Sequence, residues 1–323
     1  MKAAVYYETG LPSVLKYEEV PDPTLHPRGV LVDVQAIGIE GGDVLNRAGG
    51  DMPSKPHIVG YNCAGVIREV GAEVTDRTRG QRVMALMAFG SHASIVSVQA
   101  RQTWPIPDGV SIEHAACVPV AWGTAHDCVF EFGHLIRGEN VLIQAGAGGV
   151  GLACVQLAKR GGGVVFATAG DDAKLERLKR EFGVDHGINY RNVDFADEAR
   201  RLTGGKGIDL VVDAVGGDTI EGSIKCLGYR GRVISVGNAS RGERAVDPGW
   251  LSEQNRTLTG VFFGAEVFAH PERVTMMFHE ILRDIEKGEL KVVIDRTFPL
   301  SEAAAAHGYI ESRAAFGRVV LVP

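Results

Sequence analysis

The chain has 323 residues, of which 45% are hydrophobic and 23% charged, and at about 150 residues per domain this length predicts two domains. A chain of this size can bury a large core without disulfides or structural metals. The net charge of −6 argues against a nucleic-acid-binding face and against a polybasic membrane-binding surface. Five scattered cysteines favour reduced thiols in a cytoplasmic protein, and the first residues carry no pattern of a secretion signal.

The first part of the chain, residues 1–122, has short runs of alternating polarity separated by prolines. Gly29–Ala36, with the sequence GVLVDVQA, is one such run. Because proline lacks an amide donor, this pattern predicts short antiparallel strands and loops. The prolines are Pro12, Pro21, Pro23, Pro27, Pro53 and Pro56.

The middle part, residues 123–262, alternates apolar runs with amphipathic ones. We expect strands at Val141–Ala145, Val164–Thr168, Ile208–Val215 and Arg232–Gly237, and helices at Gly149–Arg160, from Asp171 or Asp172 to Phe182, and near Asp218–Leu227. This alternation predicts an α/β domain with a doubly wound parallel sheet. The uncharged stretch Val141–Ala158 contains four glycines, which favour a strand, a turn and a helix over a membrane span.

The last part, residues 263–323, ends in a predicted helix at Glu302–Ser312 and a strand at Gly317–Val322. These elements are too few to fold alone, so we expect them to pack on the first part, giving a discontinuous domain of residues 1–122 and 263–323. The apolar run Thr257–Gly264 predicts a strand at the far edge of the parallel sheet. An open edge strand can pair with a second copy of the chain; the alternative is a strand covered by a helix over Arg273–Lys287.

The sequence AGAGGVG directly follows the predicted strand VLIQA and opens a helix. Gly146, Gly148 and Gly151 have the spacing of a dinucleotide-binding turn, with Gly149 and Val150 between them. Such a turn brings backbone amides and the positive end of a helix dipole to a pyrophosphate. The alternative is a glycine-rich packing turn that binds no ligand.

The second strand of this motif distinguishes the nicotinamide cofactors. NAD sites place an acidic residue at its end, but VVFAT is followed by Ala169 and Gly170. Asp171 suits a helix cap, and Lys174 in the next turn can reach a 2′-phosphate. The pattern therefore favours NADPH, while the alternative for Lys174 is a solvated position on the helix.

Several segments resemble one known family. AGAGGVGLACVQLAK, HGINYRNVDF, TGGKGIDLVVDAVGG, GRVISVGNAS and ESRAAFGRVVLVP are similar to segments of the zinc-independent quinone oxidoreductase (zeta-crystallin-like) branch of the medium-chain dehydrogenase/reductase superfamily. The resemblance implies a GroES-like, mainly β catalytic domain beside a Rossmann domain. It also implies a homodimer and NADPH-dependent reduction of quinones, enones or other activated double bonds.

Family positions that contact the cofactor fall on residues of this chain. The resemblance places 2′-phosphate contacts at Gly170, Lys174 and Tyr190, and a basic residue near the cofactor at Arg313. It places Thr124 near the nicotinamide and Asn238 on a loop that contacts the cofactor.

The resemblance also implies that no zinc is bound. Zinc dehydrogenases of this superfamily use a cysteine, a histidine and a second cysteine, and the matching positions here are Glu40, Tyr61 and Val120. The lobe with four cysteines that holds structural zinc in those enzymes is missing. Zinc prefers closely arranged Cys, His or carboxylate ligands, and the histidines of this chain are scattered.

The departures from the family suggest the catalytic candidates. Leu45 stands where a tyrosine is common and Glu40 where asparagine is usual, whereas Asp43 and Arg47 are retained. We predict that Tyr61, coupled to Glu40, donates a proton to the acceptor or orients its carbonyl group, with Asp43 as a further catalytic candidate. The alternative is a structural role, with Glu40 paired to Arg47 or another cation.

The predicted reaction is hydride transfer from NADPH to a quinone or α,β-unsaturated carbonyl, which needs no Lewis acid because the acceptor is already electrophilic. One rival is an enoyl or 2-alkenal reductase of the same superfamily. The other is a non-catalytic NADPH-binding protein, as lens crystallins are, because a fold alone does not fix a function.

Overall fold

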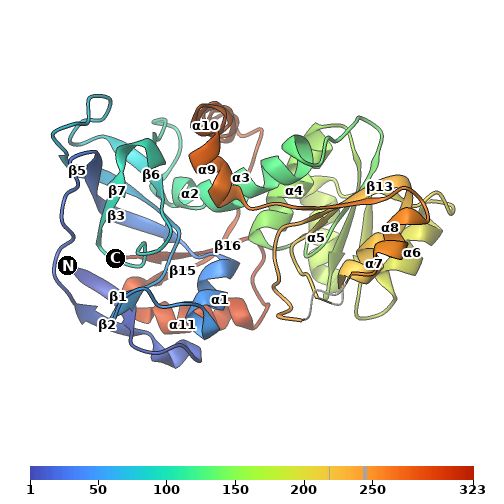
Figure 1. Cartoon of the computed structure of the whole chain (residues 1–323), viewed down its shortest axis with the longest axis horizontal. Helices are drawn as coiled ribbons and strands as arrows, with labels where there is room; N and C mark the ends of the chain where they lie inside the picture. The colour runs from blue at the N-terminus through green and yellow to red at the C-terminus, as the bar shows by residue number, and fades with distance from the viewer. Residues whose placement is uncertain (218, 243–245) are drawn as a thin grey trace. The chain divides into compact units, whose positions relative to one another are not determined.

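The computed structural model describes residues 1–217, 219–242 and 246–323. These residues form two compact units, each built around its own main sheet (Figure 1). Residues 1–123 and 264–323 make up the mixed-sheet unit, and residues 124–263 make up the parallel-sheet unit.

The mixed-sheet unit contains a seven-stranded sheet with the order β15-β16-β3-β5-β6-β8, in which β7 also pairs with β3. Its strands are β3 (Gly29–Gly38), β5 (Asn62–Val70), β6 (Arg82–Leu86), β7 (Ile95–Gln99), β8 (Thr103–Pro105), β15 (Ile294–Pro299) and β16 (Arg318–Val322). The pairs formed by β3, β5, β6, β7 and β8 are antiparallel, which confirms the prediction from the prolines. The C-terminal strand β16 pairs antiparallel with β3 through Val320 and Leu321.

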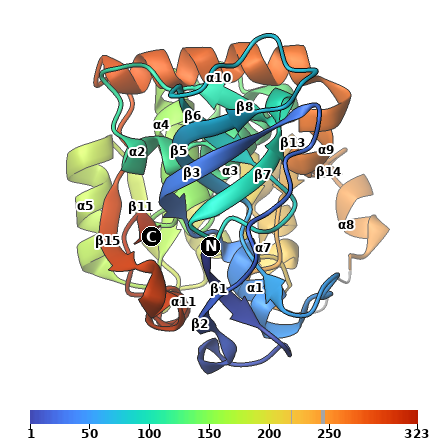
Figure 2. The same ribbon diagram turned by 90° about the vertical axis from the view of Figure 1, so that its left-hand side faces the viewer.

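A smaller sheet and several helices complete this unit. The sheet has the order β2 (Lys16–Glu19), β1 (Lys2–Tyr6), β4 (His57–Ile58). The helices are α1 (Gly41–Gly49), α2 (Ile112–Ala116), α10 (Pro271–Glu286) and α11 (Ala303–Glu311), with α3 (Pro119–His126) and α9 (Phe263–Ala269) at the boundaries of the unit; short 3₁₀ turns are η1 (Pro12–Val14), η2 (Ala100–Gln102) and η4 (Leu300–Glu302). Figure 2 shows α10 beside β8, where the Trp104 and Phe278 rings lie 4.6 Å apart.

The parallel-sheet unit has six parallel strands in the order β11-β10-β9-β12-β13-β14. They are β9 (Asn140–Ile143), β10 (Val164–Ala169), β11 (His186–Asn189), β12 (Ile208–Asp213), β13 (Leu227–Ser235) and β14 (Thr257–Gly260). The helices are α4 (Gly149–Arg160), α5 (Asp172–Phe182), α6 (Phe195–Leu202), α7 (Thr219–Lys225) and α8 (Pro248–Ser252), and η3 (Asp127–Glu131) is a π-helical turn. In order of sequence the strands are arranged 3-2-1-4-5-6, the Rossmann order, which confirms the predicted fold class.

The apolar runs of this unit are its buried strands. Val141, Leu142 and Ile143 of β9 have no exposed surface, because β9 lies in the middle of the sheet. A strand that lies in the middle of a parallel sheet and is covered on both faces shows no alternation of polarity, which is why VLIQA contains no polar residue before Gln144.

Several predicted boundaries differ from the structure by a few residues. β13 begins at Leu227 instead of Arg232, because glycines and an arginine interrupt the sequence LGYRG and leave no continuous apolar run before Arg232. The predicted strand at Thr257–Gly264 ends at Gly260, and Phe263 already begins α9. The predicted helix near Asp218–Leu227 spans Thr219–Lys225; Asp218 lies outside the described residues.

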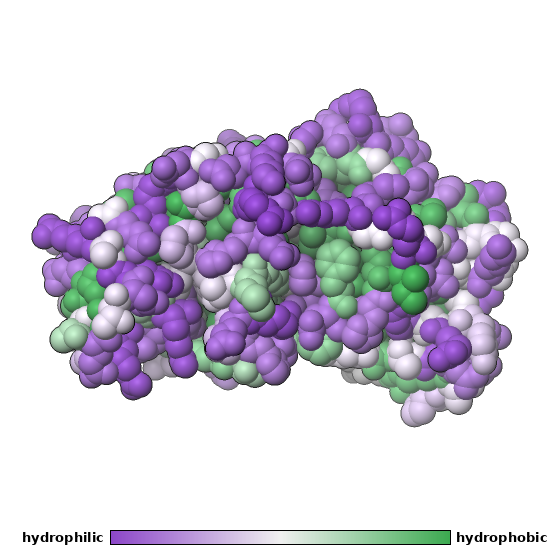
Figure 3. All heavy atoms as spheres, turned by 90° about the horizontal axis from the view of Figure 1, so that it is seen from above, coloured by the Kyte–Doolittle hydropathy of each residue, from purple (hydrophilic) through white to green (hydrophobic). Residues whose placement is uncertain are grey.

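Within the described ranges, no helix is both long enough and apolar enough to cross a bilayer. The face drawn in Figure 3 is largely hydrophilic, with hydrophobic residues in separate patches. All five cysteines are buried and none forms a disulfide with another.

Candidate functional site

The glycine turn between β9 and α4 is closely packed. Gly146 donates its amide to the Thr168 carbonyl at 2.9 Å, and Gly148 donates to the Ala145 carbonyl at 2.9 Å. A Cβ atom on Gly151 would lie only 2.9 Å from the Ala145 carbonyl carbon and from Gly146 Cα, and closer still to the Ala145 oxygen. The third glycine of the motif is therefore required for the helix to approach the strand, as the motif predicts.

The first turn of α4 has backbone donors that no side chain of the described residues caps. Gly148 is the N-cap residue and provides no side-chain acceptor, and Gly149, Val150 and Gly151 form the first helical positions. The first amides of any helix lack intrahelical acceptors, and the helix dipole adds partial positive charge there. This turn is suited to bind an anionic diphosphate, so the chain fits the dinucleotide that the motif implies.

A buried polar network holds the start of the turn, and the sequence analysis did not identify it. Thr168 Oγ1 accepts the Ala145 amide at 3.0 Å and donates to Gln144 Oε1 at 2.7 Å. Gln144 Nε2 donates to Ser223 Oγ at 3.3 Å, and Ser223 Oγ donates to Asp213 Oδ2 at 2.8 Å. The network joins the carboxyl ends of β9, β10 and β12, which fixes the turn relative to the sheet.

At the end of β10, the structure brings Gly170 and Tyr190 together. A Cβ atom on Gly170 would lie 2.7 Å from the Tyr190 hydroxyl and 3.0 Å from Arg191 Nε. Asp171 caps α5, accepting from the Ala173 amide at 2.7 Å, which confirms its predicted role as a cap. Lys174 lies in the first turn of α5. Arg191 is a cation that the sequence analysis missed, although it directly follows Tyr190.

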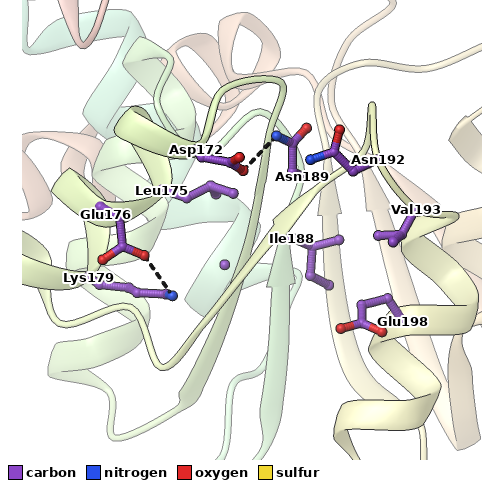
Figure 4. A pocket seen from close by; sticks show the side chains of 10 residues that line it. Asp172, Leu175, Glu176, Lys179, Ile188, Asn189, Asn192, Val193 and Glu198 are labelled. Atoms are coloured by element: carbon purple, nitrogen blue, oxygen red, sulfur yellow. Dashed lines mark hydrogen bonds and ion pairs between the residues drawn. The ribbon is translucent and has the colours of Figure 1, made fainter.

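A pocket is lined by residues of α5, β11, the segment after β11, and α6 (Figure 4). Its polar lining includes Asp172, Glu176, Glu198, Lys179 and Asn189. Asn189 donates to Asp172 at 2.7 Å, and Lys179 pairs with Glu176 at 3.0 Å. With three carboxylates around one paired lysine, this pocket is electrostatically unfavourable for a phosphate.

Asn238 and Thr124 occupy two further positions in this unit. Asn238 follows β13 and donates to the Gly242 carbonyl at 3.0 Å, so its side chain holds its own loop together. The loop also approaches the end of β12, since a Cβ atom on Gly216 would lie 2.7 Å from Asn238 Oδ1. Thr124 is buried in α3.

In the mixed-sheet unit, the Tyr61 ring lies on the first turn of α1. A Cβ atom on Gly42 would lie 2.5 Å from Tyr61 Cε2, so the ring packs directly on the Gly42 backbone. Asn46 Nδ2 donates to Tyr61 Oη at 2.7 Å. Tyr61 is half-buried, and burial together with the nearby Asp43 carboxyl raises the pKa of its phenol to about 12.

Glu40 forms a buried ion pair that the sequence analysis did not identify. Arg318 of β16 donates to both Glu40 oxygens, with Nη1 2.8 Å from Oε2. Both side chains are more than nine-tenths buried. Burial raises the pKa of Glu40, and the Arg318 guanidinium opposes this shift.

Asp43, in the first turn of α1 after Glu40, is fully buried. Its Oδ2 accepts the Glu40 amide at 2.8 Å, which fixes the first turn of α1. Burial raises the pKa of Asp43 well above its usual value, although the hydrogen bond from the Glu40 amide opposes the shift. Burial therefore makes the Asp43 carboxyl harder to ionise than an exposed aspartate.

The remaining candidates of this unit have other partners. Arg47 is buried and pairs with Glu311 of α11 at 2.5 Å, so it does not form the pair with Glu40 that the sequence analysis considered. Arg313 follows α11 with φ of +59° and donates its amide to the Ile310 carbonyl at 3.0 Å. In the part of the chain that the structure describes, no three His, Cys, Asp or Glu side chains group as metal ligands.

Two family models match the chain. Residues 26–108 match the model described as "Alcohol dehydrogenase GroES-like domain", and residues 182–321 match "Zinc-binding dehydrogenase". The first match lies on the antiparallel strands, and the second begins in the parallel-sheet unit and continues through β16.

Among curated relatives, the quinone oxidoreductase of Pseudomonas aeruginosa is 34% identical, with 97% of each chain covered. The 2-haloacrylate reductase of a Burkholderia species is 33% identical, with 99% of this chain and 98% of that protein covered. Other relatives are longer: the chain spans 65% of a synaptic vesicle membrane protein VAT-1 homolog from Danio rerio and 14% of a polyketide synthase from Aureobasidium melanogenum.

Among solved structures, the quinone oxidoreductase of Escherichia coli complexed with NADPH has a TM-score of 0.95 at 30% identity, with both chains fully covered. The CurK enoyl reductase has a TM-score of 0.89 at 28% identity, with 99% of each chain covered. The whole chain is thus similar to reductases in both sequence and structure.

Proposed function

Because the chain belongs to the zinc-independent quinone oxidoreductase branch of the medium-chain dehydrogenase/reductase superfamily and is an oxidoreductase, we propose that it transfers hydride from NADPH to a quinone or another activated carbonyl compound. The observation that carries the proposal is the turn at Gly146–Gly151, whose close packing and uncapped helix suit a diphosphate. The NADPH complex of the similar Escherichia coli enzyme supports the choice of cofactor.

The residues that would hold the cofactor form groups according to the part of NADPH that each would bind. The amides of Gly149, Val150 and Gly151, with Gly146 and Gly148, would bind the diphosphate. Gly170, Lys174, Tyr190 and Arg191 would bind the 2′-phosphate, because this end of β10 offers cations and a hydroxyl and no carboxylate takes the position typical of NAD sites. We assign nicotinamide-side and loop contacts to Thr124, Asn238 and Arg313.

The bound cofactor would supply the hydride, and the chain supplies a proton donor for the acceptor oxygen. Tyr61 is the best candidate because it is half-buried, carries an O–H group and keeps its proton at neutral pH. Glu40 is less suited to exchange protons because Arg318 donates to both of its oxygens, and Asp43 is fully buried. We therefore propose supporting roles for Glu40 and Asp43, which fix the start of α1.

We further propose that the reaction uses no zinc. Of the positions that match zinc ligands, Glu40 is bonded to Arg318, Tyr61 packs on Gly42, and Val120 offers no ligand atom. The Arg318 guanidinium thus contributes a fixed positive charge beside the Glu40 position. Chelation should leave turnover unchanged, whereas loss of turnover that zinc restores would refute this part of the proposal.

A second candidate function is reduction of a carbon–carbon double bond conjugated to a carboxyl or thioester group. The similarity to the 2-haloacrylate reductase and to the CurK enoyl reductase favours it. To separate the two functions, NADPH oxidation would be followed with a naphthoquinone, an enone, a 2-alkenal, a 2-haloacrylate and a simple ketone. Turnover of the simple ketone alone, or NADPH binding without any turnover, would refute the proposed function.

We also propose a cytoplasmic homodimer. β14 is the last strand of the parallel sheet and pairs only with β13 among the described residues, and Phe262 beyond it is 77% exposed. An open strand edge next to an exposed aromatic ring favours pairing with a second copy. Sedimentation should give twice the mass of the chain, and a monomer at micromolar concentration would refute the dimer.

A further inference from the structure

We propose that Asn46 is a positioning residue that orients the Tyr61 phenol, leaving its O–H proton available to the oxygen of the acceptor. The inference rests on the proposed reduction of a carbonyl compound and assigns a role to a residue that the sequence analysis did not consider. Asn46, Tyr61 and Gly42 all lie in the mixed-sheet unit.

The direction of one hydrogen bond carries the argument. Asn46 Nδ2 lies 2.7 Å from Tyr61 Oη, and an amide NH₂ group can only donate. The phenol oxygen therefore accepts from Asn46, and its own hydrogen must point elsewhere. In the described part of the chain, no group accepts a hydrogen bond from Tyr61 Oη, so the proton is left for a ligand.

Helix geometry explains why Asn46 reaches this ring. Gly42 and Asn46 are four residues apart in α1, so they occupy the same face of the helix. The missing side chain at Gly42 lets the ring lie on the backbone, with the Gly42 Cβ direction 2.9 Å from Tyr61 Oη. Asn46, one turn later, then meets the edge of the ring at its hydroxyl group. The ring is thus held at its Cε2 edge by Gly42 and at its oxygen by Asn46.

The surroundings favour a phenol that donates a proton and then recovers it. Burial and the negative charges of Asp43 and Glu40 keep the proton on Tyr61, whereas the Asn46 donor stabilises the phenolate. In the proposed step, the acceptor gains an electron pair by hydride transfer, and the Tyr61 O–H bond breaks as its proton bonds to the acceptor oxygen. The phenolate on Tyr61 is stabilised by Asn46 and regains a proton from water.

The test compares four variants with two acceptors: Asn46→Asp, Asn46→Ala, Tyr61→Phe, and Asn46→Asp combined with Tyr61→Phe. Asn46→Asp keeps the size of the side chain but turns the donor into an acceptor, which would capture the Tyr61 proton. Asn255→Asp is the control for added charge, because Asn255 is exposed in the parallel-sheet unit. kcat and KM for NADPH oxidation would be measured with cyclohexenone and with a naphthoquinone, alongside thermal unfolding and NADPH affinity.

With cyclohexenone, we expect Tyr61→Phe and Asn46→Asp each to lower kcat about 100-fold, the lower end of the range for a general acid. Asn46→Ala should lower it less, and Asn46→Asp should cause no further loss once Tyr61 is Phe. Losses should be smaller with the naphthoquinone, whose reduced form is a more stable anion. NADPH affinity and the control variant should not change.

Three results would overturn the inference. Full activity of Asn46→Asp would mean that Tyr61 donates to Asn46, and full activity of Tyr61→Phe would mean that the phenol is not used. Independent losses in the double variant would assign Asn46 a role apart from Tyr61. In each case the wild-type protein would still reduce its acceptors; absence of wild-type turnover would instead overturn the proposed function, and this inference with it.

Discussion

Replacing Arg191 by alanine tests the assignment of the 2′-phosphate site. Arg191 Nε lies 3.0 Å from the Cβ direction of Gly170, beside the Tyr190 hydroxyl, and no salt bridge of its side chain occurs within the described residues. A phosphate at the end of β10 would therefore meet a guanidinium that is not already neutralised. Guanidinium and phosphate form charge-assisted hydrogen bonds, which are the stronger kind.

The size of the effect follows from that contact. A hydrogen bond to a charged group contributes about 1.5–3 kcal/mol, and each 1.4 kcal/mol is about a tenfold change in affinity. Arg191→Ala should therefore weaken NADPH binding about 10- to 150-fold. NADH has no 2′-phosphate, so its affinity should change little. The ratio of NADPH affinity to NADH affinity should therefore fall by nearly the same factor as NADPH affinity. Dissociation constants from titrations of nicotinamide fluorescence would measure both.

Lys179→Ala is the matched control, because Lys179 is a cation of the neighbouring helix α5 but already pairs with Glu176 at 3.0 Å. Its loss should not change the preference between the cofactors. Equal losses of NADPH and NADH affinity in Arg191→Ala would mean that the variant disturbs the fold of the loop. An unchanged preference would mean that the phosphate is bound elsewhere and that our reading of the end of β10 is wrong.

Three further variants test the supports of the site. Gly151→Ala should lower both the unfolding temperature and NADPH affinity, because its Cβ would collide with the Ala145 backbone; a normal unfolding temperature would contradict the packing argument. Arg318→Met should cost about 3–5 kcal/mol in urea unfolding, since it leaves Glu40 buried without a cation, and a loss below 1 kcal/mol would count against it. Burial lowers the pKa of His92 to about 3, so as the pH falls the unfolded chain protonates this histidine before the folded chain does. Above the usual histidine pKa of about 6.5, the free energy of unfolding does not depend on the protonation of His92. Below that pH it should fall by about 1.4 kcal/mol per pH unit, and His92→Gln should flatten this dependence.

The sequence predicted the elements around the glycine turn because local signals mark their ends. α4 occupies Gly149–Arg160 as expected, since glycines lie at both of its ends. α5 begins after Asp171, whose carboxylate satisfies the first amides, and ends at Gly183 in the left-handed conformation. Caps and glycines act within a few residues, so a single sequence contains the whole signal.

The long-range contacts could not be predicted in the same way. Glu40 and Arg318 are separated by 278 residues. Arg318 begins an apolar strand, and its neighbours in the sequence do not indicate which residue it pairs with. Their contact follows from the pairing of β16 with β3, which ends two residues before Glu40. Gln144, Thr168, Ser223 and Asp213 likewise meet only because their strands end at the same edge of the sheet. The sequence could indicate that Glu40 needs a cation, but only the topology identifies it.

The three catalytic candidates of the mixed-sheet unit therefore have different chemistry although they lie close together. Glu40 is held by two donors of Arg318, and Asp43 has one oxygen bonded to the Glu40 amide and no exposed surface. Neither carboxyl can reach a ligand without breaking buried bonds, whereas Tyr61 is only half-buried. Their negative charges still act on Tyr61, since both raise the pKa of its phenol and keep it protonated. Neutralising Asp43 or Glu40 should therefore make Tyr61 more acidic, even though neither group touches the acceptor.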